Sequence, residues 1–185
     1  LNKLLKELSQ NKTWQILLGV KEPHKRMADR ELALRFLAIY QNWDTVKKEL
    51  IGYKGRMKSF LNVFMSSYQN VDSPTYSKFK HVFEDTIEKV LSIYGDEAFK
   101  RINIDGSRDK SINRAIMDVI MLSSTLYSKE ILLGKKECIN NRMIDLITND
   151  TNFGNSIKSG TSDTKVITYR LARWCDELES IISSH

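Results

Sequence analysis

Apolar residues recur three or four positions apart through almost the whole chain, which is the spacing of one face of an α-helix. The pattern is clearest near the end, where the apolar positions are Ile167, Leu171, Trp174, Leu178 and Ile181. No stretch alternates convincingly between apolar and polar residues, as a half-buried strand would. The sequence therefore predicts an all-α protein, a single compact domain over residues 1–185 built as a bundle of about seven to nine helices.

Turn and capping residues set the limits of the expected helices. A first helical segment ends at Gly19, with a candidate interruption at residues 11–12. Further helices are expected over residues 27–40, 57–65, 74–94, 112–126, 129–148 and 161–183. A shorter helix is expected after Gly95, and a short turn or helix around Phe153. Their expected N-caps are Ser73, Ser111, and Thr161 or Ser162. Residues 44–55 are expected to form loop or frayed helix, and residues 103–110 a polar loop.

Composition narrows the class of protein without choosing a function. The chain has 185 residues, of which 41% are hydrophobic and 28% charged, as in an ordinary globular domain. Only 2 prolines and 8 glycines occur, too few for an all-β protein with many tight turns. Lys plus Arg number 29 against 23 for Asp plus Glu, a net charge of +6. This modest excess permits contact with nucleic acid but does not establish it.

Cysteine usage and the chain start bear on location. Cys138 and Cys175 form no disulfide framework, and a reduced protein of the cytoplasm is the plain interpretation. No apolar run approaches the roughly 20 residues of a membrane span, so no membrane partner is expected. Because the first residue is Leu1 rather than Met, we expect the chain to be a fragment from which upstream residues are missing.

The search for catalytic and metal-binding patterns returns little. His81 and Asp85 are one helical turn apart and could form half a metal site, although a surface histidine beside a carboxylate is far commoner. No nucleophile motif occurs, so no catalytic residue, metal or cofactor is expected in this chain. The stretch GYKGR at 52–56 has the spacing of a phosphate-clamping GxxG loop, but a turn between helices explains it better.

Basic clusters are the remaining signal for a binding function. The candidate nucleic-acid contacts are Lys21, Lys25, Arg26, Arg30, Lys54, Arg56 and Lys58. If they share a face, they make a positive stripe that could follow phosphates. A solvated, lysine-rich surface is the alternative explanation. A second cluster flanks the polar loop and comprises Lys100, Arg101, Arg108, Lys110 and Arg114.

A different set of charges is expected to support the fold. Asp29 suits the first turn of a helix, where a carboxylate meets the positive end of the helix dipole. Arg35 lies between two apolar residues, so its guanidinium is expected to be partly buried and to need a carboxylate partner. Glu31, at the favourable i, i+4 spacing, and Asp118, from a distant helix, are the candidates.

Several stretches resemble one prokaryotic family in the right order. RMADRELALRFLA followed by YKGRMKSFLN is similar to the pattern of proteins typified by the GmrS part of the GmrSD modification-dependent restriction enzymes. The positions that carry this first resemblance are Arg26, Met27, Asp29, Glu31, Leu32, Leu34, Arg35, Phe36, Leu37, Ala38, Tyr53, Gly55, Met57, Phe60, Leu61 and Asn62. Later elements agree through Asn113, Ala115, Asp118, Phe153, Gly160, Thr161, Val166 and Arg170.

The resemblance implies the non-catalytic helical half of a nucleotide-dependent DNA restriction or phage-defence protein. The family's Asp-Gly-Gln-Arg motif, which lies in an N-terminal domain similar to ParB and sulfiredoxin, does not occur in this chain. The leading hypothesis is therefore a helical module that packs on such a domain and contacts DNA phosphates. Two others stay open: an enzyme with an unrecognised site, and a structural or oligomerisation domain that uses residues 161–183 as its seam.

Overall fold

The computed structural model describes residues 1–22, 27–158 and 161–184, and within them the all-α prediction is confirmed. In chain order the elements are α1 (Asn2–Ser9), α2 (Lys12–Leu18), α3 (Ala28–Asn42), β1 (Trp43–Asp44), β2 (Glu49–Leu50), α4 (Met57–Ser67), α5 (Ser73–Tyr94), α6 (Arg114–Ser124), α7 (Lys129–Gly134), α8 (Lys136–Asn149), α9 (Thr151–Lys158) and α10 (Thr164–Ser183). None of the described helices is long and apolar enough to cross a membrane.

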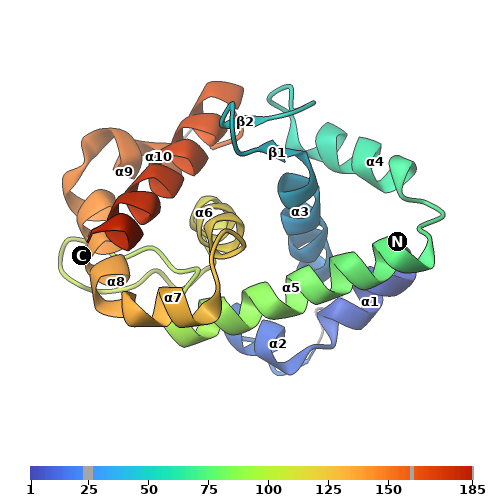
Figure 1. Ribbon diagram of the computed structural model, residues 1–185, viewed down its shortest axis with the longest axis horizontal. Coiled ribbons are helices and arrows are strands. Elements are labelled where there is room, and N and C mark those ends of the chain that lie inside the picture. Colours follow the sequence, from blue (N-terminus) through green and yellow to red (C-terminus); the bar gives the residue numbers. More distant parts are fainter. Residues whose placement is uncertain (23–26, 159–160, 185) are drawn as a thin grey trace.

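Helix α6 lies at the centre of the molecule, and α3, α5, α9 and α10 pack around it (Figure 1). Every residue from Ala115 to Ser124 is buried. A helix that is buried on all sides needs apolar residues all round, and the sequence AIMDVIMLSS supplies them at most positions. Asp118 is the charged exception, so it must find its partners inside the protein.

The seam of α10 faces α6 rather than solvent. Ile167, Leu171, Trp174 and Leu178 are each fully buried within the chain. The indole Nε1–H of Trp174 donates a hydrogen bond to the hydroxyl oxygen of Ser123 in α6, over 2.9 Å. This seam is therefore covered inside the molecule, which removes the reason for expecting it to join two copies of the chain.

Aromatic rings fill the part of the core between α2, α3 and α5. Trp14 meets the ring of Phe83 edge to face, with ring centroids 5.0 Å apart. Phe36 of α3 contacts the same ring at 5.9 Å, and Phe99 contacts Trp14 at the same distance. Such edge-to-face pairs stabilise a core beyond the apolar area that they bury.

The predicted C-terminal end of α2 at Gly19 is confirmed, whereas the predicted N-cap residues of three helices differ from the observed ones. Gly19 has a φ of 65° and ends α2, as predicted, because glycine adopts this left-handed conformation without strain. The observed N-caps are Asp72, Asn113 and Asp163, instead of Ser73, Ser111, and Thr161 or Ser162. Each of the observed caps accepts a hydrogen bond from a backbone N–H two or three residues later.

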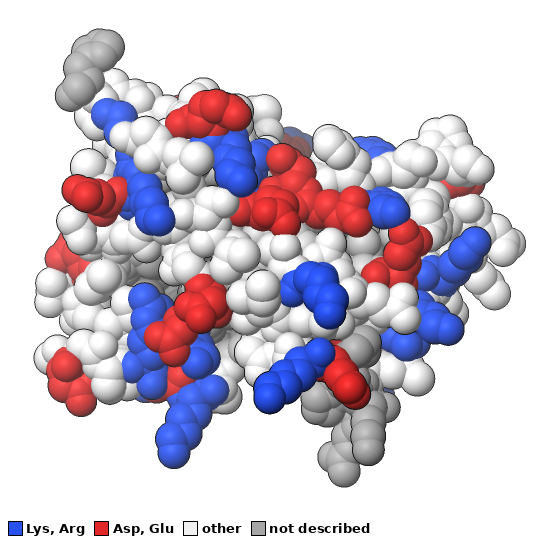
Figure 2. Space-filling view, turned by 90° about the horizontal axis from the view of Figure 1, so that it is seen from below, with Lys and Arg blue, Asp and Glu red and all other residues white. Residues whose placement is uncertain are grey.

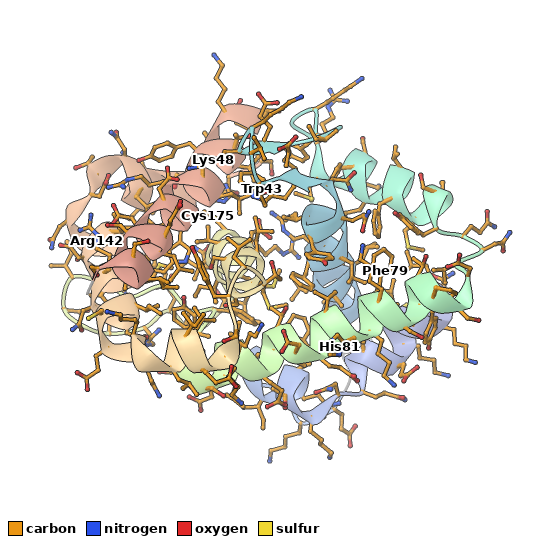
Figure 3. The ribbon with its side chains drawn as sticks, viewed as in Figure 1. Trp43, Lys48, Phe79, His81, Arg142 and Cys175 are labelled. Carbon is orange, nitrogen blue, oxygen red and sulfur yellow. The ribbon has the colours of Figure 1, made fainter. Side chains whose placement is uncertain are left out.

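Three local predictions were wrong. Residues 44–55 include a short hairpin, in which Trp43 pairs with Leu50, because the Asp44 carboxylate accepts the N–H groups of Val46 and Lys47 and closes the turn. The hairpin lies over α10 (Figures 1 and 3), where Lys48 pairs with Asp176. The helix expected over 129–148 is interrupted after Gly134, a poor helix former. The segment after Gly95 forms a turn instead of a helix.

Candidate anion-binding groove

A buried ion pair joins α3 to α6. Arg35 donates its Nε–H and an Nη2–H to the two carboxylate oxygens of Asp118, each over 2.6 Å. The side chains of Arg35 and Asp118 are only 9% and 0% exposed. Of the two predicted candidates, Asp118 is thus the partner of Arg35. The other candidate, Glu31, lies 3.5 Å from Arg114 instead. Two parallel hydrogen bonds to one carboxylate fix the guanidinium plane in place.

Arg170 of α10 is the third member of this buried cluster. Its Nη2–H donates to Oδ2 of Asp118 over 3.1 Å, and its Nη1–H donates to the carbonyl oxygen of Thr161 over 2.8 Å. Its side chain is fully buried, and its Nε has no hydrogen-bond acceptor among the described residues. Two guanidinium groups therefore share one carboxylate, which leaves one positive charge in the interior.

Burial and charge act in opposite directions on the two arginines. Burial opposes the charge of Arg35, but the Asp118 carboxylate more than offsets it and raises the pKa of Arg35 above its ordinary value. For Arg170 burial prevails and lowers the pKa, although Asp118 acts against it. Burial also raises the pKa of Tyr53, whose hydroxyl donates to the carbonyl oxygen of Ser162 over 2.6 Å. Because Tyr53 and Arg170 both hold residues 161–162, this turn stays fixed beside the cluster.

An open groove of about 600 Å³ lies directly above Arg35, between α3, α4, the start of α6 and the turn at 161–162. Its apolar lining consists of Leu34, Met57 and Leu61. Its polar lining consists of Glu31, Arg35, Lys58, Asn62, Arg114, Thr161 and Ser162. Arg35 uses Nε and Nη2 for Asp118, and its Nη1 has no hydrogen-bond partner among the described residues. The groove therefore has a cationic donor at its floor.

The charge of the groove is positive. The basic groups at its surface or directly behind it are Arg35, Lys58, Arg114 and Arg170, and the acidic groups are Glu31 and Asp118. These groups carry an excess of two positive charges. Glu31 and Arg114 are both more than half exposed, so water screens their interaction strongly. The arrangement suits an anion that enters from solvent, and it offers no nucleophile and base within one another's reach.

Arg114 belongs to this site, although sequence reasoning placed it with the polar loop. Glu31 and Arg35 are one turn apart on α3, and Arg114 and Asp118 are one turn apart on α6. The two helices meet with these pairs in register, Glu31 beside Arg114 and Arg35 beside Asp118. The i, i+4 spacing of Arg114 and Asp118 was the available signal, since such residues share a helix face.

The predicted nucleic-acid contacts do not all come together. Lys58 lines the groove, and Arg56, the residue before α4, is exposed close to it, as is Lys54. Arg30 lies in the first turn of α3, where its Nη1 is 3.8 Å from the sulfur of Met27. Lys21 is exposed beyond the end of α2, away from the groove lining. Lys25 and Arg26 lie outside the described residues.

Asp29, the remaining member of the predicted charge network, does not line the groove. It is 3% exposed in the first turn of α3, and its carboxylate accepts the backbone N–H of Arg30 over 2.9 Å. This bond satisfies a donor that the start of a helix leaves unpaired. Asp29 therefore supports the fold at the start of α3, two residues before Glu31.

Three residues of the second basic cluster, Lys100, Arg101 and Arg108, form ion pairs with nearby carboxylates. Arg101 lies 3.1 Å from the Asp109 carboxylate, and Arg108 and Lys100 lie 3.7 and 2.8 Å from Glu97. In contrast, Lys54, Arg56 and Lys58 form no ion pair with any described residue. The cations near residues 100–109 therefore fit a solvated surface of paired charges, whereas those beside the groove are left for a ligand.

The face of the molecule that α2 and α5 cover is also of mixed charge. Figure 2 shows acidic and basic side chains interleaved on this face. Among the residues of α5, Lys80 pairs with Glu7 and Lys89 with Asp85. His81 lies on the outer side of α5 (Figure 3), and its neighbour Asp85 is held 2.6 Å from Lys89. No group of three or more potential metal ligands occurs among the described residues.

Comparison of the chain with family models, curated proteins and solved structures finds no significant match. The resemblance to GmrS-like proteins therefore remains a prediction from the motifs. Some of the residues that carry it converge in the fold. Those that line the groove are Glu31, Leu34, Arg35, Met57, Leu61, Asn62 and Thr161, and those in the buried cluster behind it are Asp118 and Arg170.

Proposed function

We propose that this chain is a non-catalytic helical module that contacts the phosphate backbone of DNA through the groove between α3, α4 and α6. The single observation that carries the proposal is the excess of positive charge in this groove, with the unpartnered Nη1 of Arg35 at its floor. Phosphate contacts by Lys and Arg give most of the affinity of sequence-independent DNA binding.

The contrast between the basic regions supports this choice of surface. Cations near residues 100–109 are paired with Glu97 and Asp109, so little charge is left for a polyanion. Lys54, Arg56 and Lys58 are exposed to solvent, and a phosphate could replace the water around them at little cost. In the context that the motif resemblance implies, the module would work beside an N-terminal nucleotide-handling domain in a GmrS-like restriction or phage-defence protein.

A salt titration tests the proposal. Affinity for a DNA duplex with 5′-hydroxyl ends is measured by fluorescence anisotropy from low to high salt, for the full chain and for Lys58→Ala with Arg114→Ala. Each cation that neutralises a phosphate contributes about 0.9 to the slope of log affinity against log salt. The double variant is therefore expected to reduce the slope by about two. Both side chains are exposed, so folding is expected to persist.

A matched control separates this groove from net charge. Lys3→Ala with Lys136→Ala also removes two positive charges, from exposed positions on α1 and α8 that do not line the groove. It is expected to leave the slope nearly unchanged. Equal losses in the two double variants, or no binding at low salt, would overturn the proposal.

A further inference from the structure

We infer that the groove binds a phosphate monoester, the group that ends a phosphorylated nucleic-acid strand, with Arg35 at its floor. The inference rests on the proposed function, because it names the ligand of the same site. Three features of the groove support it: the depth of the floor, the size of the charge, and the division of the walls into a polar and an apolar side.

The depth of Arg35 favours a strand end over an internal phosphate. Its side chain is only 9% exposed, yet its Nη1 has no partner among the described residues. The Nη1 atom is accessible from the groove, so an anionic oxygen that reaches it gains a charge-assisted hydrogen bond. An internal phosphodiester has a sugar on each side, which hinders its approach to the floor of the groove. A terminal phosphate projects from the strand and can reach the floor.

The charge balance points the same way. The groove and the buried cluster behind it carry an excess of two positive charges. A phosphate monoester carries about −1.5 to −2 at pH 7, whereas an internal phosphodiester carries a single negative charge. The monoester therefore matches the site more closely. Asp118 holds the Arg35 guanidinium in place before any ligand binds, which reduces the ordering cost of binding.

The walls can hold the rest of a terminal nucleotide. Lys58 and Arg114 come from α4 and α6, and Asn62 and Thr161 add neutral hydrogen-bonding groups. Leu34, Met57 and Leu61 form an apolar wall for the sugar or the base. The volume of about 600 Å³ far exceeds a phosphate and is typical of a small-molecule site.

The experiment compares two single-stranded oligonucleotides that differ only in a 5′-phosphate or 5′-hydroxyl end. Anisotropy at about 0.15 M salt is expected to give about tenfold tighter binding of the phosphorylated strand, the gain from one or two charge-assisted hydrogen bonds. Lys58→Ala with Arg114→Ala should abolish this preference, and Lys3→Ala with Lys136→Ala should retain it. The preference should also shrink between pH 7.5 and 5.5, because the second pKa of a phosphate monoester is about 6.

Competition identifies the source of the monoester. A nucleoside 5′-monophosphate is expected to displace the phosphorylated strand more weakly than an unlabelled copy of that strand, and the nucleoside alone should not displace it. Equal competition by the free monophosphate would overturn the assignment to a strand end, and equal competition by the nucleoside would overturn the phosphate site.

The two proposals fail separately. Equal affinity for the two strands, with the duplex still bound, would overturn this inference and leave the proposed function standing. Preference for the phosphorylated strand without any duplex binding would do the reverse. Because the decisive variants are at exposed positions, their circular dichroism spectrum and melting temperature should match those of the parent chain, which separates lost binding from lost folding.

Discussion

The core between α2, α3 and α5 and the core between α3, α6 and α10 are built from different chemistry. In the first, the ring of Phe83 contacts those of Trp14 and Phe36, and the packing depends on the shapes of the side chains. In the second, Arg35 and Arg170 both pair with Asp118, and the packing depends on these charges. An aromatic cluster tolerates a substitution that keeps volume, whereas a buried charge cluster fails when one member loses its charge, even at constant shape.

The largest expected effect comes from Asp118→Asn. The side chain keeps its shape, but two buried guanidinium groups lose the one carboxylate with which they pair among the described residues, and breaking a buried pair typically costs about 3–5 kcal/mol. Urea denaturation measures the loss. Asp176→Asn, which removes the partner of Lys48 on the surface, is the control and should change stability little. Similar stabilities for the two variants would contradict the assignment of the charge cluster to the core.

Arg35→Ala is expected to cost less, about 1–3 kcal/mol, although it removes more atoms. Asp118 keeps Arg170 as a partner after this change, so one charge pair survives. Thermal unfolding by circular dichroism measures the loss, with the exposed Arg114→Ala as control. A thermally silent Arg35→Ala would mean that Arg170 alone neutralises Asp118.

Phe83→Leu tests the aromatic part of the core. A change between apolar residues of similar size usually costs under about 1.5 kcal/mol, and the loss should not vary with salt. Urea denaturation of Phe83→Leu and Asp118→Asn at low and high salt compares the two losses of stability. Only Asp118→Asn changes a charge, so only its loss should vary with salt. A loss from Phe83→Leu above that from Asp118→Asn would reverse the order of the two parts of the core.

Glu177→Gln is expected to have the smallest effect, about 0.5–1 kcal/mol after solvent screening. A hydrogen bond from Arg142 lowers the pKa of Glu177, opposed by burial and helped by Arg173. A carboxyl group whose pKa is lowered in the folded state stabilises the fold at pH values above its unfolded-state pKa, which is 4.5 for this group. That contribution is lost as the pH falls through the folded-state pKa. The stability difference from the parent should therefore be present at pH 7 and vanish under acid.

Much of the fold could be predicted because the helices carry strong periodic signals. The start of α5 could not be placed to the residue, because Asp72 and Ser73 are both good caps and only the backbone geometry chooses between them. The hairpin at Trp43–Leu50 has strands of two residues, too short for an alternating pattern. The break after Gly134 depends on how α7 and α8 pack against other helices, which local propensity does not report.

The groove was only partly predictable. Charged residues inside apolar helical stretches, such as Arg35 and Asp118, signal a buried pair even in one sequence. Arg170 carried the same signal, because it follows Ile167 by three and precedes Trp174 by four on the apolar seam. Arg114 and Lys58 line one groove because α4 and α6 both pack against α3, and no local pattern in the sequence encodes that arrangement.

The sharing of Asp118 by two arginines also has a consequence for the folding pathway. Asp118 is separated from Arg35 by 83 residues and from Arg170 by 52, so the cluster forms only when three distant helices have come together. Such long-range contacts carry a large chain-closure cost and tend to be absent from the transition state, where local helices and nearby apolar contacts dominate. We therefore expect the cluster to form late in folding. It should slow the unfolding of the native state and leave the folding rate nearly unchanged.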